Sequence, residues 1–465
     1  MSGPILGVIE GFYGPPWTWQ ERDRMVDFMA AHRYNLYVHA PKDDAMHRTS
    51  WRDRYLPEEL RTFGRLARHC ATKGIEFVYG ISPIDIVRRD TGDFDVLNEK
   101  VGQVQALGVR SFCLLLDDLP GGLPDEAVAR ARVAEVQAGL ANRLLRRLAA
   151  KGETRLIFTP TEYCGTGDSA YLRALGEKLS AEIEVFWTGP QVCSHTISAG
   201  DLRAVTKSLR RRPLIWDNYP VNDGEMRHDP HIRPYQGRGA DLPSAVAGIV
   251  ANPAIEAEAS KIALHTIAAY WADPASYDPE RAWTTALDEL TQTPAGANAL
   301  RILGNLTRRS PIEPGAHRRQ LPAFATFWER WENGAVRSRR AAIVQLRREI
   351  ERFAAAGQLI RTGLPNRPLR HDLGPWARKL LTWCEALRQA VEVLTIALDD
   401  PAPGAIEAQR RIALARLTAA RRDVYRVAER PFEAFVRQCL WEAAALVERR
   451  EAGLHAGPLR SEAVS

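Results

Sequence analysis

The sequence predicts an α/β protein, a (β/α)8 barrel of the TIM type followed by an all-α helical bundle. Two observations lead to this prediction. Over the first 285 residues, short apolar runs rich in β-branched residues alternate with amphipathic stretches, as in βα units around a parallel sheet. After the segment WADPASYDPERAW (271–283) these runs disappear, and Ala, Leu, Arg and Glu dominate. We therefore expect a barrel over 1–285, a helical bundle over 286–455 and a disordered tail over 456–465.

Eight apolar runs are the predicted strands of the barrel. Each is nearly continuous in apolar residues, which indicates burial on both faces, and eight βα units in about 250 residues fit a closed barrel. An open doubly wound sheet is the alternative, but it should show a GxGxxG fingerprint after its first strand, and GFYGPPW (11–17) is not one. The segments between the strands read as helices. The predicted strands are 4–12, 35–42, 75–83, 111–119, 154–163, 183–190, 213–218 and 247–252.

The C-terminal part reads as an antiparallel bundle of helices. Pro431 is expected to kink or end one of them, because proline lacks a backbone N–H. Residues 301–465 contain 29 Lys and Arg against 18 Asp and Glu, a formal charge of +11, whereas residues 1–300 carry −5. Solvated arginine-rich faces are the simpler explanation, and a surface for an acidic partner is the alternative. The predicted helices are 321–334, 337–357, 374–400, 404–430 and 432–453.

Composition excludes several classes of protein. The chain is 45% hydrophobic and 26% charged, which is ordinary for a globular protein. Its six cysteines are scattered without a CxxC pair, which argues against structural zinc or a disulfide framework and fits a reducing cytoplasm. No apolar run reaches the roughly 18 residues of a membrane span, and the start has no secretory pattern. We expect a cytoplasmic protein with no cofactor, no metal, and neither nucleic acid nor membrane as a partner; a homo-oligomer is left open.

Polar and aromatic residues collect at the carboxyl ends of the predicted strands, where barrels of this type hold their chemistry. Carboxylates and amides can bind sugar hydroxyls, and aromatic faces can pack on the sugar ring. Neither His nor Cys is among the main candidates; His228 and His231 lack helical spacing and a third metal ligand. The candidates are Gly11, Lys42, Asp117, Asp118, Tyr163, Trp216, Asn218, Asp223 and Asn252.

The stretch LLLDDLPGG (114–122) places Asp117 and Asp118 side by side at the end of an apolar run. Adjacent side chains on a strand point to opposite faces, so both can face one site only where the strand ends. Two carboxyl groups that lie close together have different apparent pKa values, which favours one ionised and one protonated group. The alternatives are a solvated loop or helix cap for this pair, a surface ion pair of Lys42 with its neighbours Asp43 or Asp44, and core positions for the aromatic candidates.

Seven separated motifs occur in the order found in glycoside hydrolase family 84, and the chain resembles this family over about residues 4–271. The family includes protein O-GlcNAcases and bacterial β-N-acetylglucosaminidases. The resemblance implies removal of a terminal GlcNAc by a retaining mechanism in which the sugar's own 2-acetamido oxygen attacks the anomeric carbon and gives an oxazoline. The motifs are GVIEGFYGPPW, LYVHAPKDD, LLLDDLP, TPTEYCGT, WTGP, IWDNYPVND and VANP.

The same resemblance assigns roles to single residues. Asp117 would hold the acetamido N–H and stabilise the oxazoline, and Asp118 would be the general acid and then the base. Asn218 would contact the acetamido group, and Tyr163 and Trp216 would line the pocket around the acetyl group. Lys42 and Gly11 would contact the 3-hydroxyl, and Asp223 and Asn252 would contact the 4- and 6-hydroxyls.

Two other classes of function stay open on sequence grounds. One is a barrel that binds an amino sugar without turnover, and the other is a metal-dependent lyase or isomerase, which the lack of a clear ligand set disfavours. Within the hydrolase reading, glycan or cell-wall fragments compete with glycopeptides and glycoproteins as substrates. The sequence does not determine the aglycone or the roles of the basic bundle and of the loop 224–238.

Overall fold

The computed structural model describes residues 4–86, 92–118, 122–313, 321–399 and 403–452. The chain divides into two compact units: Met1–Arg227, His231–Ala286 and Ser310–Glu313 form the first, and His228–Pro230, Leu287–Arg309 and Pro314–Ser465 form the second. The expected tail at 456–465 and most of the Pro-Gly turn after Asp118 lie outside the described residues.

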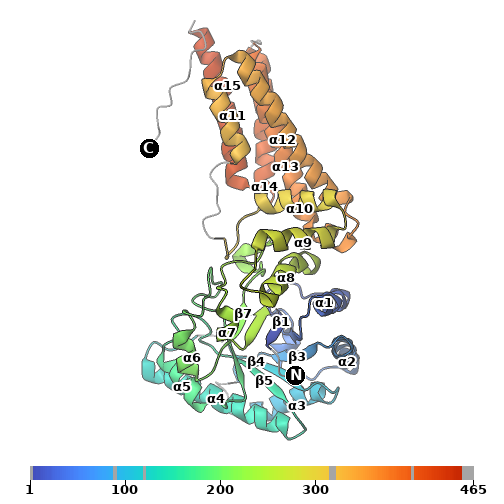
Figure 1. Ribbon diagram of the computed structural model, residues 1–465, viewed down its shortest axis with the longest axis vertical. Coiled ribbons are helices and arrows are strands. Elements are labelled where there is room, and N and C mark those ends of the chain that lie inside the picture. The colour runs from blue at the N-terminus through green and yellow to red at the C-terminus, as the bar shows by residue number, and fades with distance from the viewer. Residues whose placement is uncertain (1–3, 87–91, 119–121, 314–320, 400–402, 453–465) are drawn as a thin grey trace. The chain divides into compact units, whose positions relative to one another are not determined.

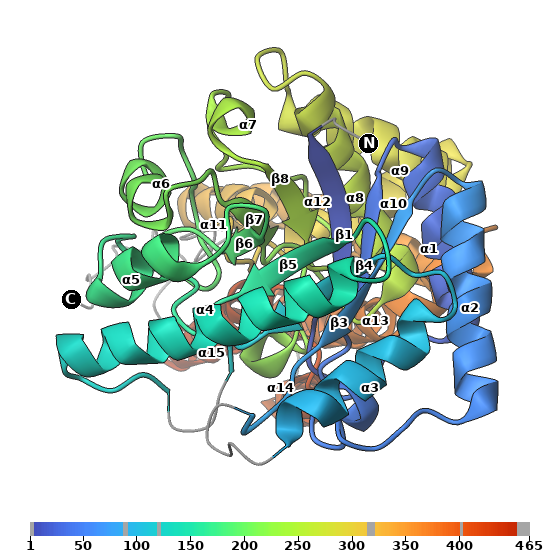
Figure 2. The ribbon, with the colours of Figure 1, turned by 90° about the horizontal axis from the view of Figure 1, so that it is seen from below.

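The first unit is a closed barrel of eight parallel strands that follow one another in sequence order, which confirms the predicted fold class. β1 pairs with β2 on one side and closes the barrel on β8 on the other, where Ile5 lies opposite Gly248. Helices surround the strands (Figure 2). The strands are β1 (Ile5–Glu10), β2 (Leu36–His39), β3 (Glu76–Ile81), β4 (Ser111–Leu115), β5 (Arg155–Thr159), β6 (Glu184–Trp187), β7 (Leu214–Asp217) and β8 (Gly248–Ala251).

Amphipathic helices connect these strands. Thr18 begins α1 with a capping box: its side chain accepts from the backbone N–H of Glu21, and the Glu21 carboxylate accepts in return from Thr18. The connecting elements are α1 (Trp19–Ala31), η1 (Ala45–His47), α2 (Pro57–Thr72), α3 (Asp93–Gln105), α4 (Ala127–Ala149), α5 (Ala170–Lys178), α6 (Arg203–Leu209), η2 (Gly224–Met226), α7 (Leu242–Ala245) and α8 (Ala257–Ala272).

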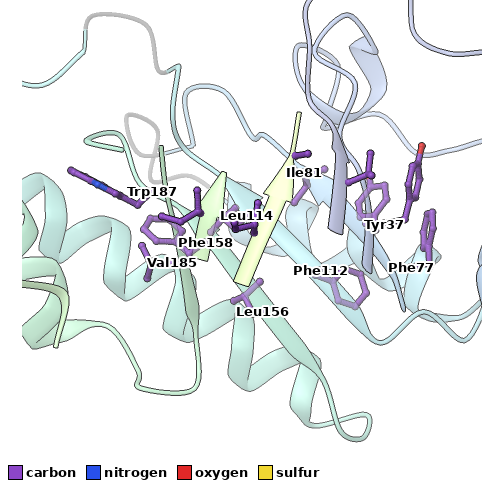
Figure 3. Packing of buried hydrophobic residues seen from close by; sticks show 14 of the residues in the cluster. Tyr37, Phe77, Ile81, Phe112, Leu114, Leu156, Phe158, Val185 and Trp187 are labelled. Carbon is purple, nitrogen blue, oxygen red and sulfur yellow. The ribbon is translucent and has the colours of Figure 1, made fainter. Parts of the chain in front are cut away.

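Both faces of the strands are buried, as the apolar runs predicted. Along β4, Phe112 and Leu114 belong to the larger cluster between strands and helices, and the alternate residues Cys113 and Leu115 belong to a second cluster. This second cluster draws on all eight strands and fills the barrel interior. Figure 3 shows side chains of the outer cluster on neighbouring strands.

The strands end earlier than predicted, and this places the candidate site residues. β4 ends at Leu115, two residues before Asp117, and β7 ends at Asp217, directly before Asn218. Leu116 still donates its N–H to the carbonyl of Thr159, but Asp117, Asp118 and Asn218 lie beyond the strands, so successive side chains need no longer alternate between faces. This is the condition that two adjacent aspartates need in order to face one site.

The second unit is helical, and the boundary between the units falls within α9 (Pro279–Thr291). The long helix α13 packs against α12, α14 and α15, and these helices lie side by side (Figure 1). The helices of this unit are α10 (Pro294–Leu306), α11 (Pro322–Asn333), α12 (Val336–Thr362), α13 (Arg367–Leu398), α14 (Pro403–Arg422) and α15 (Glu429–Glu451).

Several details of the predicted helices are wrong, including the end of the helix expected over 337–357, which continues to Thr362. The helix expected over 404–430 stops at Arg422, and Pro431 does not end it but lies in the first turn of α15. Proline is tolerated there because first-turn N–H groups have no partner within the helix. The helix expected from residue 374 begins at Arg367 and contains Pro375.

Four of the five tryptophans in this part pack in the helical core, and Trp441 on α15 is the exception at 64% exposed. The buried tryptophans are Trp328, Trp331, Trp376 and Trp383.

Among the residues that the structure describes, no helix has the length and apolar character to cross a membrane.

Candidate active site

All nine candidate residues of the sequence line a single cavity of about 130 Å³ at the carboxyl ends of the strands. The structure therefore brings together residues from six strand ends that are up to 241 positions apart in the chain. The cavity is also lined by Tyr13, Thr159, Phe186, Thr188, Val192, Cys193 and Val221.

Lys42 bridges the two adjacent aspartates. Its ammonium group donates to Asp117 Oδ2 and, at 3.1 Å, to Asp118 Oδ2. The Lys42 side chain is only 3% exposed. The surface pairing with Asp43 or Asp44 is thus wrong, because those carboxylates accept backbone N–H groups of Gly14 and Met46 instead.

The cations around Asp118 lower the pKa of its carboxyl group. Burial raises the pKa of Asp118, but Lys42, the hydrogen bond from Tyr13 and the charge of Arg48 outweigh burial, and the net pKa lies below the usual value. The expectation that like-charge repulsion keeps one of the two protonated considered the carboxylates alone. With an ammonium group between them, the charged form of Asp118 is favoured.

One carboxylate oxygen of Asp117, a residue that lines the cavity, has no hydrogen-bond partner among the described residues. Its side chain is 8% exposed, and Lys42 occupies Oδ2. Oδ1 is buried, and no group among the described residues donates a hydrogen bond to it. A buried carboxylate oxygen without a donor is unfavourable by itself, so this atom is ready to accept an N–H or O–H of a bound molecule.

A buried carboxylate anchors the loop that follows β1. Glu10 accepts two hydrogen bonds from the guanidinium of Arg22, both 2.8 Å, one of 2.6 Å from the hydroxyl of Tyr37, and one of 3.0 Å from the backbone N–H of Trp17. These bonds fix the loop that carries Gly11 and Tyr13 into the cavity. Tyr13 donates its hydroxyl to Asp118 Oδ2 at 2.6 Å, and burial followed by that bond raises its pKa to about 12.

Amides from the ends of β7 and β8 form the opposite wall. Asn218 Oδ1 accepts from Trp216 Nε1 and from Asn252 Nδ2, both at 2.9 Å. Its Nδ2 donates to the carbonyl of Val192 at 2.7 Å, which leaves the second N–H of this amide for a ligand. Trp216 also packs in the barrel interior against Phe186, so it is both a core residue and a wall of the cavity.

Side chains at the end of β7 and after it have two different roles: some line the cavity, and others hold the surrounding structure. Asp217, between Trp216 and Asn218, points away and forms a buried ion pair with Arg238. Asp223 reaches the cavity, where its Oδ2 accepts the backbone N–H of Tyr13 at 2.8 Å, and burial raises its pKa.

The sequence alone did not identify three residues at or near the cavity. Tyr13 and Cys193 line the cavity, and Arg48 lies beside Asp118. Tyr13 stands two positions after Gly11 in the recognised EGFYG segment, so its place at a strand end could have identified it. Arg48 lies nine residues beyond the end of β2, and its guanidinium comes within 3.9 Å of Asp118. No local pattern marks such an approach.

Comparison with known families identifies the chain. A family model described as beta-N-acetylglucosaminidase matches residues 6–305, which is more than half of the sequence. The chain belongs to the beta-N-acetylglucosaminidase family. This confirms the resemblance to glycoside hydrolase family 84, a family of glycosidases.

The relatives of this beta-N-acetylglucosaminidase family member include proteins named for O-GlcNAc. The proteins called Protein O-GlcNAcase from rat and mouse are each 38% identical over 276 residues, 57% of this chain, and the match spans only 30% of their length. A mutant of the O-GlcNAc hydrolase of Thermobaculum terrenum is 32% identical with a TM-score of 0.85, over 97% of this chain and 96% of that one. CpGH84B is 26% identical with a TM-score of 0.78, over 94% and 76% of the respective chains.

Replacement of Gly11 is expected to lower both the stability of the fold and the activity. A Cβ atom at this position would lie 2.6 Å from Cζ2 of Trp216, so the indole would have to move. We expect Gly11→Ala to destabilise the fold by about 1–3 kcal/mol and to reduce kcat/KM for an aryl β-N-acetylglucosaminide. Gly139→Ala is the matched control, because no atom lies within 4 Å of its Cβ position in α4 and alanine is favoured over glycine in a helix. Urea unfolding and kinetics of both variants test this, and wild-type kinetics in Gly11→Ala would contradict it.

Proposed function

We propose that the protein is a retaining β-N-acetylglucosaminidase that releases terminal GlcNAc, with the substrate's own 2-acetamido oxygen as the nucleophile and an oxazoline as the intermediate. The observation that carries this proposal is the buried Oδ1 of Asp117, for which the described part of the chain offers no donor, beside the more exposed carboxylate of Asp118. One carboxylate is arranged to accept a hydrogen bond, and its neighbour is arranged to exchange protons.

Asp117 is the proposed acetamido contact. Because Lys42 already binds Oδ2, Oδ1 accepts the acetamido N–H and turns the acetamido oxygen toward the anomeric carbon. As that oxygen attacks, positive charge develops on the acetamido group, and a fixed carboxylate beside it stabilises the charge. The ammonium of Lys42 keeps Asp117 in place while it does so.

Asp118 is the proposed proton shuttle. Its side chain is 32% exposed, so the leaving group and later water can reach it. An aglycone that covers this side chain removes water from it, which favours the neutral acid and offsets the cations that lower its pKa. Asp118 then gives its proton to the glycosidic oxygen as the bond to the sugar breaks, and takes a proton from the water that opens the oxazoline. The usual scheme with two opposed carboxylates is not required, because the nucleophile belongs to the substrate.

The remaining candidates are proposed to bind the sugar. The free N–H of Asn218 supports its place at the acetamido end, and Trp216 with Tyr163 forms the wall around the acetyl group. Asp223 and Asn252 face the same cavity from the β7 and β8 ends and suit the 4- and 6-hydroxyls. Lys42 and the backbone of Gly11 suit the 3-hydroxyl side.

The proposed substrates carry GlcNAc on serine or threonine of a protein or peptide. Relatives named Protein O-GlcNAcase and O-GlcNAc hydrolase support this class. The six cysteines are free thiols, which supports the proposed cytoplasmic location. The formal charge of +11 on residues 301–465 favours acidic glycopeptides, whereas glycan and cell-wall fragments are the competing substrates.

Time-resolved proton NMR of the hydrolysis of an aryl β-GlcNAc glycoside tests the proposal. We expect β-GlcNAc as the first product, in the presence of a metal chelator, because attack from the acetamido side and then by water inverts the anomeric centre twice. An initial α-product would contradict a retaining mechanism, and binding without turnover would favour the amino-sugar-binding barrel. Parallel assays on a GlcNAc glycopeptide, chitobiose and a muropeptide identify the aglycone class.

A further inference from the structure

Arg48 lies beside two of the residues that line the cavity, Tyr13 and Asp118. It follows η1, and its guanidinium lies 5.1 Å from the ring centroid of Tyr13, with Nη2 3.9 Å from Asp118 Oδ2. The side chain is only 14% exposed, and its Nε is buried with no acceptor among the described residues. The guanidinium is therefore largely buried, and among the described residues its Nε lacks the hydrogen bond that normally accompanies burial.

A neighbouring arginine shows what a structural role looks like in the same segment. Arg52 stacks on Trp51 at 4.3 Å and pairs with both oxygens of Asp93, at 2.8 and 2.5 Å. Its charge is thus satisfied by a bidentate partner. Arg48 has one ion pair among the described residues, at the long distance of 3.9 Å, and that partner is Asp118.

We propose that Arg48 is a positioning residue that sets the orientation and the acid strength of Asp118. It supports the ring of Tyr13, whose hydroxyl donates to Asp118 Oδ2, and it places a fixed positive charge beside the same oxygen. This inference rests on the proposed function, in which Asp118 cycles between acid and base.

Arg48 is one of several charged or titratable groups that surround Asp118. From the loop after β1 comes Tyr13, and from the segment after β2 come Lys42 and Arg48. The carboxylate of Asp117 is adjacent, and the Tyr163 hydroxyl after β5 and the Asp223 carboxylate after β7 also interact with the charge of Asp118. Lys42 serves both aspartates, so Arg48 is the cation that acts on Asp118 without an ion pair to Asp117.

The effect of this charge has opposite signs in the two steps of the reaction. In the first step the proton passes from Asp118 to the glycosidic oxygen, the bond from that oxygen to C1 breaks, and the acetamido oxygen bonds to C1. A cation beside the resulting carboxylate favours this step. In the second step water bonds to C1, the oxazoline C–O bond breaks, and the water proton passes to Asp118. The same cation makes Asp118 a weaker base there.

The pH profile of a neutral variant distinguishes this role from simple structural support. In Arg48→Met the pKa of Asp118 should rise, because an opposite charge that favoured its ionised form is gone. For an alkyl β-GlcNAc glycoside, which needs a proton to depart, kcat/KM should fall about threefold or more on the acidic plateau. The basic limb, which is the fall of kcat/KM at high pH, should move to higher pH, because Asp118 then keeps its proton up to a higher pH. An activated aryl glycoside should lose less, since its leaving group departs without a proton.

Matched variants complete the experiment. Arg48→Lys keeps the charge and should keep the wild-type limb, and Arg52→Met should leave the limb unmoved. Arg48→Gln replaces Arg48→Met if the latter does not fold. A folded neutral variant whose basic limb stays in place, or which loses activity equally at every pH on both substrates, would overturn the inference. If the wild-type protein releases no GlcNAc, the proposed function fails instead, and carbon NMR titration of Asp118 in wild type and Arg48→Met decides the present inference separately.

Discussion

Asp118→Asn is expected to lose about 10²- to 10⁴-fold in kcat/KM on substrates with poor leaving groups and far less on an activated aryl glycoside. The reason is that an alkoxide-like leaving group needs the proton of Asp118, whereas an acidic phenol departs without it. Because kcat/KM reports only the steps up to the departure of the leaving group, it does not report the second step, in which Asp118 acts as the base. A slower second step should lower kcat instead.

Asp117→Asn should behave differently, with a loss on the order of 10²- to 10³-fold across the whole leaving-group series. Ring closure requires the acetamido group whichever aglycone departs, so no leaving group can rescue it. The variant also leaves the buried ammonium of Lys42 with one carboxylate fewer.

The measurement is kcat/KM for both variants over aryl and alkyl β-GlcNAc glycosides of graded leaving-group pKa. Asp168→Asn is a suitable control, because Asp168 pairs with Arg173 on the surface, where both side chains are well over half exposed and such pairs contribute little. Equal losses in the two cavity variants along the series would refute the division of roles between Asp117 and Asp118.

Much of the site follows from the sequence because barrel chemistry collects at strand ends. The apolar runs identified all eight strands, and the polar residues just past them converge on one cavity. The ends of the runs were placed too late, since Leu116 continues the apolar pattern of β4 after the strand has ended at Leu115. That overshoot is harmless for the function, because the residues past the ladder are the ones that face the cavity.

Features that depend on tertiary contacts could not be predicted in the same way. The low pKa of Asp118 depends on Lys42, which lies 76 residues away in the chain. The end of α14 is a similar case: Lys379 on α13 donates to the carbonyls of Ala420 and Asp423, at 2.6 and 2.7 Å. Carbonyls at a helix C-terminus lack partners within the helix, and a cation from another helix satisfies them where the local sequence gives no stop signal.

The central claim is that the nucleophile belongs to the substrate. A β-configured product alone does not establish this, because a covalent intermediate on the enzyme would also give retention. The direct measurement is kcat/KM for aryl glycosides of glucosamine whose N-acetyl group carries no, one, two or three fluorine atoms. Each fluorine withdraws electron density from the acetamido oxygen, so we expect kcat/KM to fall steeply and progressively along the series. A rate that does not change with fluorination would show that the acetamido oxygen does not attack, and would contradict the proposed mechanism.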